Sequence, residues 1–513
     1  MDKRLTQTRT GPPQPDPRKR LGALGEQLAA EHLARLGYRI VGLGDTAVRE
    51  SRDRIHAAVL NSGFKFLDRR ITANLAPASL RKAGPGFDAA IALALLAASE
   101  QVPAAALRGI AVFGELSLGG ELRDSPGVLA VAEGARRAGC TQLFVPRQRA
   151  REAALVGGLE IVPVRSLTEA AGVLRGQPVP AMPDQRTGGS PPTAPPDLSD
   201  VRGHEIPLLA LEIAAAGGHN LLMEGAPGTG KTMLARRLPS ILPTLSRADA
   251  IEVTRLHSVA GLHAGGLITA RPFRAPHHTI SPSGLAGGGS PPRPGEATLA
   301  HHGVLFLDEL SEFQRPALDS LRQPLEDGSV VIVRGQRSLL FPTRFMLVAA
   351  TNPCPCGYAG VGDRCSCGEL DLRRHRRRLS GPLLDRIDLL VDVRRPQDSE
   401  LRAPARTSSE QVLTRVSEAR QRQRRRLRAS GARCNGEMDA RTAQRSVRCD
   451  EDGLAQLGRA YETGALSARG RHRVVRVAQT IADLDGRERV RRSDVLLALS
   501  LRQRSASELL MSA

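Results

Sequence analysis

A glycine-rich segment near the middle of the chain has the residue types and spacing of a phosphate-binding loop. It reads GAPGTGKT, the pattern G-x-x-x-x-G-K-[ST], and lies between the apolar NLLME and the helix-like MLARRL. Glycines let backbone N–H groups converge on phosphate oxygens, and Lys231 and the Thr232 hydroxyl are placed to meet the β- and γ-phosphates and Mg²⁺. The segment therefore predicts a site for ATP and Mg²⁺. Its residues are Gly225, Ala226, Pro227, Gly228, Thr229, Gly230, Lys231 and Thr232.

Two acidic residues and an asparagine end later strand-like segments. Asp308 and Glu309 follow the apolar run of GVLFLDEL, and Asn352 ends FMLVAATN. A carboxylate beside a phosphate loop can hold the Mg²⁺ shell, and its neighbour can polarise the attacking water. We therefore expect Asp308 to hold Mg²⁺, Glu309 to act as the base, and Asn352 to hold the water against the γ-phosphate. Acids and asparagines are also common at strand ends, so the order of the segments along the chain carries this prediction.

Four of the seven cysteines lie close together in the pattern C-x-C-x₈-C-x-C: Cys354, Cys356, Cys365 and Cys367. The sequence shows no export signal, which disfavours disulfides, and four thiolates can close a tetrahedral, structural Zn²⁺ site. The C-x-C spacing is tighter than the usual ligand spacing, and a reduced surface loop is the alternative.

The elements that must position these residues alternate between strands and helices. The segments 220–225, 303–310 and 345–353 predict strands, and the intervening segments predict helices, a pattern typical of a parallel sheet covered by helices. From residue 407 onward the sequence predicts helices, beginning with a long arginine-rich one over 407–430. Residues 330–342 predict two strands joined by a turn that carries Arg334 and Arg337.

The net charge is +20 over 513 residues, and basic side chains are concentrated near the end of the chain. Residues 401–513 hold 24 basic and 13 acidic side chains. This excess favours a polyanionic partner such as DNA, bound through phosphates because aromatic residues make up only 3%. Only five of the 73 basic residues are lysines, so a compositional preference for arginine is the competing explanation. No apolar run approaches the ~18 residues that span a bilayer, and we expect a cytoplasmic protein without a membrane segment.

The order of these motifs resembles that of the AAA+ ATPases, and within them the YifB/ComM family of magnesium-chelatase-like ATPases. The resemblance implies an α/β fold, an AAA+ P-loop parallel sheet with a helical lid, and a homo-hexameric motor that acts on single-stranded or branched DNA, as a helicase or in branch migration during recombination or natural transformation. The alternative is a magnesium-chelatase-like ATPase that remodels a protein and has no DNA substrate. The segments that carry the resemblance are RPFRAPHHTIS (271–281), GGGSPPRPGEATLAHHGVLFLDEL (287–310), LRQPLEDG (321–328), TNPCPCGY (351–358), LSGPLLDRIDL (379–389) and SARGRHRVVRVAQTIADL (467–484).

The same resemblance implies roles for four arginines. Arg386 in LLDRIDL matches the arginine finger, which reaches the γ-phosphate of the neighbouring subunit, and Arg469 matches the sensor-2 position on the lid. In ring motors of similar build, a hairpin just before the asparagine-bearing strand projects into the pore. Arg334 and Arg337 lie at the turn of such a hairpin and are our candidates for contacts with DNA phosphates.

The segment 42–99 resembles the family's N-terminal domain, which is similar to the α+β Lon-protease (S5-like) domain. Gly86 and Leu129 stand where a Lon-type protease has its Ser nucleophile and Lys base, so we expect no proteolysis and a role in binding DNA or a partner. Residues 21–41 resemble the start of the YraN (UPF0102) nuclease-like proteins. The expected divisions are a YraN-like remnant and basic tail at 1–41, a truncated Lon-like domain at 42–175, a linker at 176–200, the AAA+ core with a Cys-rich insert (354–367) at 201–400, and the arginine-rich, helical lid at 401–513.

Overall fold

The computed structural model contains two compact units. One comprises residues 1–186 with 264–266, and the other comprises residues 187–263 and 267–513. Of the expected tail and remnant at 1–41, only the strand β1 (Tyr38–Val41) falls within the described part of the chain. The structure describes residues 38–41, 46–67, 71–74, 85–183, 195–262, 265–289, 292–334, 337–378, 381–404, 407–464 and 466–502.

The first unit is built around a parallel three-stranded sheet in the order β3 (Ile110–Val112), β6 (Gln142–Pro146), β7 (Glu160–Val164). Residues 110–116 form two strands, β3 and β4 (Glu115–Leu116), because the chain leaves the sheet after Phe113 and then pairs antiparallel with β5 (Leu122–Arg123). β1 pairs in parallel with β2 (Ile71–Asn74). The helices are α2 (Thr46–Asn61), α3 (Asp88–Ala98), α4 (Val128–Arg137), α5 (Ala150–Ala154) and α6 (Leu167–Leu174).

The packing around the two positions that would carry a Lon-type active site does not suit catalytic side chains. A Cβ at Gly86 would lie 2.4 Å from the ring of Phe113, so a serine there would have to displace that ring. Leu129 is fully buried. The expectation that this unit does not cleave peptides stays a prediction, and the packing adds a steric reason to the chemical one.

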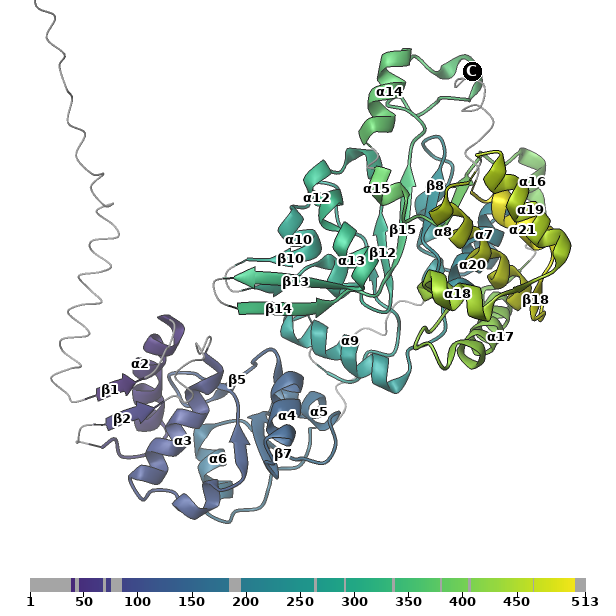
Figure 1. Cartoon of the computed structure of the whole chain (residues 1–513). Helices are drawn as coiled ribbons and strands as arrows, with labels where there is room; N and C mark the ends of the chain where they lie inside the picture. Colours follow the sequence, from purple (N-terminus) through teal and green to yellow (C-terminus); the bar gives the residue numbers. More distant parts are fainter. Residues whose placement is uncertain are drawn as a thin grey trace, which may run out of the picture. The chain divides into compact units, whose positions relative to one another are not determined.

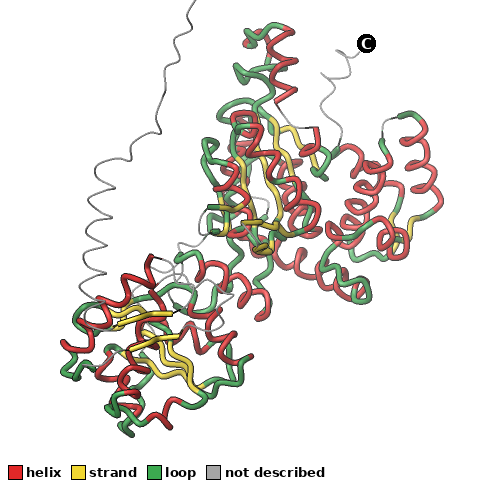
Figure 2. The backbone as a smooth tube through the Cα atoms, turned by 60° about the vertical axis from the view of Figure 1, so that its left-hand side comes forward, coloured by secondary structure: helices red, strands yellow, loops and turns green. Residues whose placement is uncertain are grey.

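The second unit contains a five-stranded parallel sheet in the order β16 (Leu389–Asp392), β8 (Leu221–Glu224), β15 (Met346–Thr351), β12 (Val304–Leu307), β9 (Phe273–Arg274). The three predicted strands are thereby confirmed. Neighbouring residues of β8 and β12 contribute to different apolar clusters, one on each face of the sheet. Figure 2 shows helices on both sides of this strand layer, the arrangement of the AAA+ fold.

The part of this unit that precedes the lid also contains helices on both sides of the sheet and a short pair of strands. Leu198, at the end of the expected linker, is buried in the same apolar cluster as β8. The core helices are α7 (Glu205–Gly217), α8 (Lys231–Ala235), α9 (Arg247–Val259), α10 (Pro282–Ala286), α11 (Glu296–Leu299), α12 (Arg315–Ser320), α13 (Arg322–Asp327), α14 (Glu369–Arg378), α15 (Gly381–Leu384) and α16 (Asp398–Arg402). The strands β10 (Gly287–Gly288) and β11 (Arg293–Pro294) form a short antiparallel pair.

The lid begins with the long helix that the sequence predicts. It is α17 (Ser409–Leu427), which starts at a capping box of Ser408 and Gln411 and buries Val412 and Val416. Contacts with α7 hold it against the core. The remaining lid elements are α18 (Ala440–Ser446), β17 (Arg448–Cys449), α19 (Glu451–Glu462), α20 (Ala468–Leu484), β18 (Arg489–Val490) and α21 (Arg492–Ser500).

The expected hairpin is present as β13 (Ser329–Arg334) and β14 (Arg337–Pro342), paired antiparallel with Arg334 opposite Arg337. Figure 1 shows the two strands running side by side away from the five-stranded sheet. The side chains of Arg334 and Arg337 and the two residues between them lie outside the described part of the structure. Within the described ranges, no helix is both long and apolar enough to cross a bilayer.

Candidate nucleotide site and its opposite edge

The glycine-rich loop connects the carboxyl end of β8 to α8. The N–H of Gly225 donates to the carbonyl of Thr351 at the end of β15, over 3.2 Å. Gly228 and Gly230 have φ angles of +76° and +92°, a region that favours glycine. A Cβ at Gly225 would lie 2.3 Å from the carbonyl oxygen of Val393, so a side chain there would force the loop off the sheet. Glycine is therefore required for both the curvature of the loop and its close approach to the strands.

Lys231 lies inside this loop. Its Nζ donates to the carbonyls of Gly225 (2.6 Å) and Ala226 (2.9 Å) and to Oδ1 of Asn352 (3.1 Å). Burial lowers the pKa of Lys231, and the carboxylate of Asp308 acts against that shift. The ammonium group and the predicted asparagine are thus in direct contact, although 121 positions separate them in the sequence.

The predicted Mg²⁺ ligands also meet. Oγ1 of Thr232 donates to Oδ2 of Asp308 over 2.6 Å, and Asp308 directly follows β12. Hydroxyl and carboxylate oxygens are the donors that Mg²⁺ prefers, so this pair fits the ion that the loop implies. Glu309 has a φ of +52°, and its side chain is 57% exposed. Its Oε2 lies 3.4 Å from Nδ1 of His278. Because more than half of the side chain is exposed, water can reach this carboxylate.

Asn352 is held from a helix that sequence reasoning did not connect with it. Nε2 of His375, on α14, is hydrogen-bonded to the carbonyl of Asn352 over 2.9 Å. His375 is only 4% exposed although it lies within the arginine run RRHRRR. The signal available in the sequence was a single histidine within a run of arginines. In the structure this histidine marks the face of α14 that packs on the site.

His204 is a second residue that sequence reasoning missed. It precedes α7, is 7% exposed, and its ring lies beside Gly230 of the loop. Burial lowers the pKa of His204, which favours the neutral ring. Among the described residues its Nδ1 has no hydrogen-bond partner. No sequence pattern pointed to His204. Its backbone has a φ of +59°, and no local motif in the sequence predicts that conformation.

Arg386 lies at the opposite edge of the sheet from the glycine-rich loop. Its carbonyl accepts a hydrogen bond from Nδ2 of Asn220 (2.8 Å), the residue just before β8, whereas the loop begins after β8. A strand of four residues spans about 13 Å, which exceeds the reach of an arginine side chain. The Arg386 side chain pairs with Glu326 of α13 on this amino edge. Arg386 therefore cannot serve the loop of its own chain.

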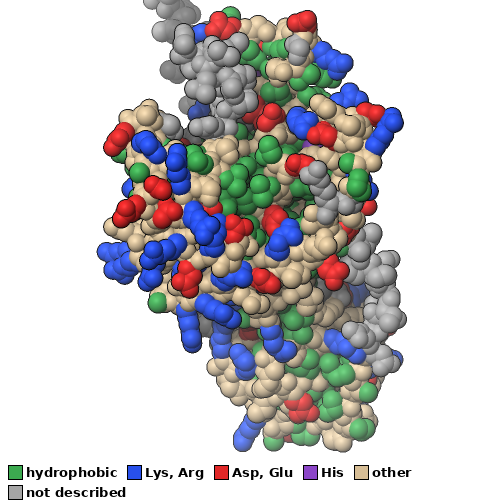
Figure 3. Space-filling model, turned by 90° about the vertical axis from the view of Figure 1, so that its right-hand side faces the viewer, with side chains coloured by type: hydrophobic (Ala, Val, Ile, Leu, Met, Phe, Trp, Pro, Cys, Tyr) green, Lys and Arg blue, Asp and Glu red, His purple; other side chains and the backbone are tan. Residues whose placement is uncertain are grey.

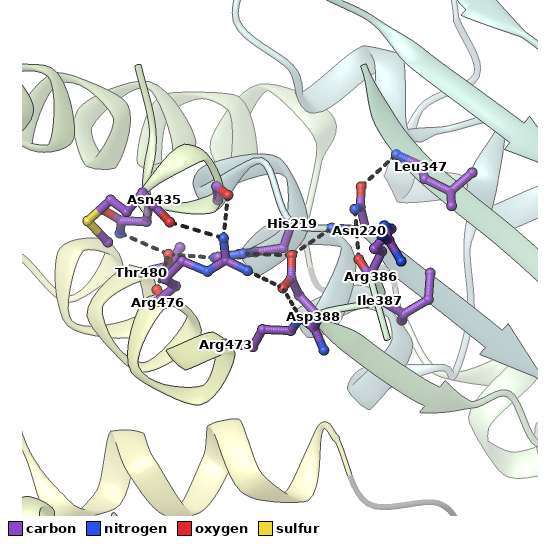
Figure 4. Close-up of polar contacts among 12 residues, drawn as sticks. His219, Asn220, Leu347, Arg386, Ile387, Asp388, Asn435, Arg473, Arg476 and Thr480 are labelled. Atoms are coloured by element: carbon purple, nitrogen blue, oxygen red, sulfur yellow. Dashed lines mark hydrogen bonds and ion pairs between the residues drawn. The ribbon is translucent and has the colours of Figure 1, made fainter. Parts of the chain in front are cut away.

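A buried ion network fixes the backbone next to Arg386 (Figure 4). Asp388 contacts Arg476 of the lid (2.9 Å) and lies 3.7 Å from Arg473. Asp388 Oδ2 also accepts the N–H of Asn220 over 3.2 Å. Burial alone would raise the pKa of Asp388, but the guanidinium groups, Arg476 foremost, bring it below its usual value. The network joins the starts of β8 and β16 to α20, so core and lid are bonded at this edge.

Arg469 lies on the same side as Arg386. It is exposed at the start of α20, and both arginines line a cleft of about 1120 Å³ at the amino edge of the sheet. The structure thus brings the two predicted arginines together, and it places them apart from Lys231, Asp308, Glu309 and Asn352. The arginines that line the cleft are Arg271, Arg344, Arg386, Arg420, Arg424, Arg428, Arg433, Arg469, Arg473 and Arg476.

Part of the arginine run in α17 is used within the protein. Arg420 donates to the carbonyl of Ala215, and Arg426 forms a two-pronged ion pair with the buried Asp483 (2.6 and 2.7 Å). Arg424 and Arg425 are exposed. Figure 3, which faces the lid, shows basic side chains interspersed with acidic ones. Some arginines of the run are therefore used for contacts within the protein and others are exposed. The total charge of the run overstates the number of arginines that a nucleic acid could contact.

The four clustered cysteines form a compact group after β15. Their Sγ atoms all lie within 4.8 Å of one another. Cys354 is 3.3 Å from Cys356 and 3.8 Å from Cys365, measured between sulfurs, and Cys356 is 3.6 Å from Cys365. The N–H of Cys356 donates to the sulfur of Cys367 over 3.4 Å. All four predicted ligands are thus brought together as free thiols.

Family models and known proteins match nearly the whole chain. Residues 31–149 match "Subunit ChlI of Mg-chelatase", residues 197–401 match "Magnesium chelatase, subunit ChlI", and residues 406–502 match its C-terminal part. A protein of Mycobacterium tuberculosis described as uncharacterized is 44% identical, covering 92% of this chain and 94% of its own length.

Two further relatives have similar coverage. The protein YifB of Salmonella typhimurium, also described as uncharacterized, is 42% identical over 91% of each chain. The competence protein ComM of Haemophilus influenzae is 39% identical over 91% of this chain and 92% of its own.

Proposed function

The chain belongs to the YifB/ComM family of magnesium-chelatase-like AAA+ ATPases, and from that premise we propose that it is a homo-hexameric motor that uses ATP hydrolysis to move on DNA in the cytoplasm. The observation that carries the proposal is the separation of Arg386 and Arg469 from the glycine-rich loop. Each chain holds one half of an ATPase site at either edge of its sheet. A closed ring of identical subunits brings opposite edges together and completes every site.

On the loop side, the residues of this chain divide the work of hydrolysis. The loop amides and Lys231 bind and orient the phosphates, and Thr232 and Asp308 would hold Mg²⁺, which supplies charge neutralisation at the β- and γ-phosphates. Glu309, exposed beside the loop, accepts a proton from the attacking water. Asn352, fixed against Lys231, orients that water. Sequence and geometry both support these assignments.

On the opposite edge, Arg386 and Arg469 supply positive charge to the neighbour's γ-phosphate. A guanidinium delivered in trans stabilises the charge that develops in phosphoryl transfer, an effect of ~10³-fold or more. The pairing of Arg386 with Glu326 keeps this side chain at the cleft rather than in the core. The nucleotide of the neighbouring subunit then replaces Glu326 as the partner of Arg386.

The proposal that the substrate is DNA rests on the hairpin and on the charge of the chain. The pairing of β13 with β14 sets the backbone of Arg334 opposite that of Arg337 at the end of the described hairpin. Phosphate contacts of this kind are independent of base sequence, as a translocating motor requires. One relative is described as a competence protein, a description that is compatible with an activity on DNA.

The test is the ATPase rate of the assembled protein with no DNA, with single-stranded DNA and with a branched junction. We expect at least one DNA form to stimulate the ATPase rate. The Glu309→Gln variant is the hydrolysis-deficient control. Absence of stimulation by every form, in a preparation shown to be hexameric, would contradict the DNA role while leaving the ATPase intact.

The alternative is a protein-remodelling ATPase, favoured by the match of three segments to magnesium chelatase subunit ChlI. Such a motor acts through a dedicated protein partner rather than through a nucleic acid. A DNA-independent ATPase that is stimulated by a co-purifying protein would support it.

A further inference from the structure

The four sulfurs have the spacing of a single tetrahedral metal site. A Zn–S bond of about 2.3 Å gives S···S separations of about 3.8 Å in a regular tetrahedron. The separations of 3.3, 3.6 and 3.8 Å among Cys354, Cys356 and Cys365 lie near that value, and the sulfur of Cys367 lies within 4.8 Å of the other three. A disulfide requires sulfurs only about 2.05 Å apart. A cubane iron–sulfur cluster binds each thiolate to a different iron, which spreads the sulfurs further than this group allows.

Backbone amides support negative charge on these sulfurs. The N–H of Ala359 donates to Cys354 (3.2 Å) and that of Cys356 donates to Cys367 (3.4 Å). Donors of this kind orient thiolate ligands around a metal. Cys354 is fully buried, and Cys356, Cys365 and Cys367 are half-buried, so the group is anchored to the molecule at Cys354 and faces solvent on its other side.

The cysteine loop is attached to the nucleotide site at three points. Only Pro353 separates Cys354 from Asn352. Gly357, which follows Cys356, packs so closely on Pro227 of the glycine-rich loop that a Cβ would lie 2.6 Å from the proline ring. After Cys367 the chain enters α14, from which His375 reaches back to the carbonyl of Asn352. Asn352 is therefore held from both ends of the cysteine loop.

We propose that Cys354, Cys356, Cys365 and Cys367 bind one Zn²⁺, and that this ion positions Asn352 and the glycine-rich loop for ATP hydrolysis. The metal binds no substrate, because four thiolates leave no open coordination position. It acts by fixing the path of the chain between β15 and α14. The positioning role rests on the proposed ATPase, whereas the metal site does not.

The metal is tested first, on the full chain purified without added chelator. We expect one zinc per chain in the wild type, and charge-transfer absorption of a tetrahedral cobalt thiolate when Co²⁺ replaces zinc. The Cys365→Ser/Cys367→Ser variant should lose both signals, and Cys140→Ser, in the first unit, should keep them. Reduced wild-type protein that holds no zinc and takes up neither Zn²⁺ nor Co²⁺ would overturn the metal site. Bound iron in place of zinc would overturn its identity.

The positioning role is tested by a cycle of metal removal and the Asn352→Ala substitution. We expect zinc removal to lower kcat about tenfold or more in the wild type, the size of effect seen when the support of a site is lost. If zinc acts through Asn352, its removal should change kcat much less in Asn352→Ala, because the two losses are then not additive. Full additivity, or unchanged kcat after zinc removal, would overturn the role.

His375 offers a variant that leaves the thiolates intact. His375→Ala should lower kcat while the protein keeps one zinc per chain, because only the contact with the Asn352 carbonyl is lost. Unchanged kcat in that variant would contradict the attachment through α14. If the wild type proved to have no ATPase, the zinc content and the cobalt spectrum would still decide the metal site.

Discussion

Single residues at the carboxyl edge of the sheet have different proposed roles, and they differ in their contacts and exposure in the same way. Lys231 is enclosed by carbonyls of its own loop and by Asn352, as a group that binds and orients must be. Glu309 is exposed and has a left-handed φ that turns it out of the strand direction, where water can reach it. A compact ammonium suits the narrow loop better than a planar guanidinium, and Lys231 is one of only five lysines among the 73 basic residues of the chain.

These positions predict opposite phenotypes for two substitutions. Lys231→Ala should weaken ATP binding strongly, because the charge that meets the phosphates is removed. Glu309→Gln should bind ATP with near wild-type affinity and hydrolyse it at least 100-fold more slowly, because the amide cannot accept the proton. Equilibrium binding of a fluorescent ATP analogue and steady-state turnover measure the two effects. Full turnover by Glu309→Gln would show that another group is the base.

At the scale of elements, the lid helix α20 is bonded to the starts of two core strands through Asp388. Replacing one partner of a buried ion pair leaves the other charge unpaired, which costs about 3 kcal/mol or more. Arg476 and Arg473 are 18% and 11% exposed, so water does little to compensate them. The junction of lid and core should therefore depend on the charge state of Asp388.

This dependence predicts a pH profile. The folded-state pKa of Asp388 is lowered, so its contribution to the free energy of unfolding is present above the ordinary carboxyl pKa, about 4, and is lost as the pH falls below it. Asp388→Asn should lower the unfolding temperature at pH 7, and the difference from wild type should shrink below about pH 4. Asp398→Asn, at an exposed pair with Arg402, is the matched control and should change neither. Equal effects of the two substitutions in thermal unfolding would refute this account.

The hairpin is the second element with its own prediction. Arg334→Ala/Arg337→Ala should reduce DNA stimulation of the ATPase and lower the salt dependence of DNA binding, while the rate without DNA stays unchanged. Arg425→Ala, on an exposed position of α17, controls for loss of charge in general. ATPase assays with a DNA titration at two salt concentrations make the comparison. Equal losses in both variants would assign the effect to overall charge instead of the hairpin.

At the scale of the whole molecule, the proposed division of the ATPase site between two sheet edges would require assembly. The prediction is complementation in mixed rings. Lys231→Ala and Arg386→Ala should each be nearly inactive alone, but a mixture should hydrolyse ATP, because an intact loop meets an intact arginine at some interfaces. The ATPase rate against mixing ratio should pass through a maximum. A mixture no more active than its components, with mixed rings verified, would rule out action in trans.

The sequence predicted those features that short, contiguous motifs encode, and it did not predict contacts between residues far apart in the chain. The loop 225–232 and the strand ends at Asp308 and Asn352 are short motifs beside apolar runs, and their positions followed directly. The contact of Asn220 with Asp388 joins residues 168 positions apart, and His375 reaches Asn352 across 23. No local periodicity encodes such pairs.

The arginine run of α17 gives the same lesson in another form. Composition counted every guanidinium equally, but Arg426 is committed to Asp483 and Arg424 is exposed. Which side of a charged helix faces the protein depends on partners contributed by α7 and α20. The sequence therefore predicted the helix and its charge, but not the division of that charge.

The Asp388 network also bears on cooperativity around a ring. Arg386 lies two residues before Asp388, and Arg469 lies one helical turn before Arg473, so the same ion cluster anchors both arginines. They therefore change position together, and only when the lid and the strand starts change position together. In the proposed ring, a subunit that adjusts its lid to its own nucleotide would move both guanidinium groups relative to the next subunit. Sequential hydrolysis at neighbouring sites would then need no additional signal, because the Asp388 carboxylate links both arginines to the lid of their own subunit.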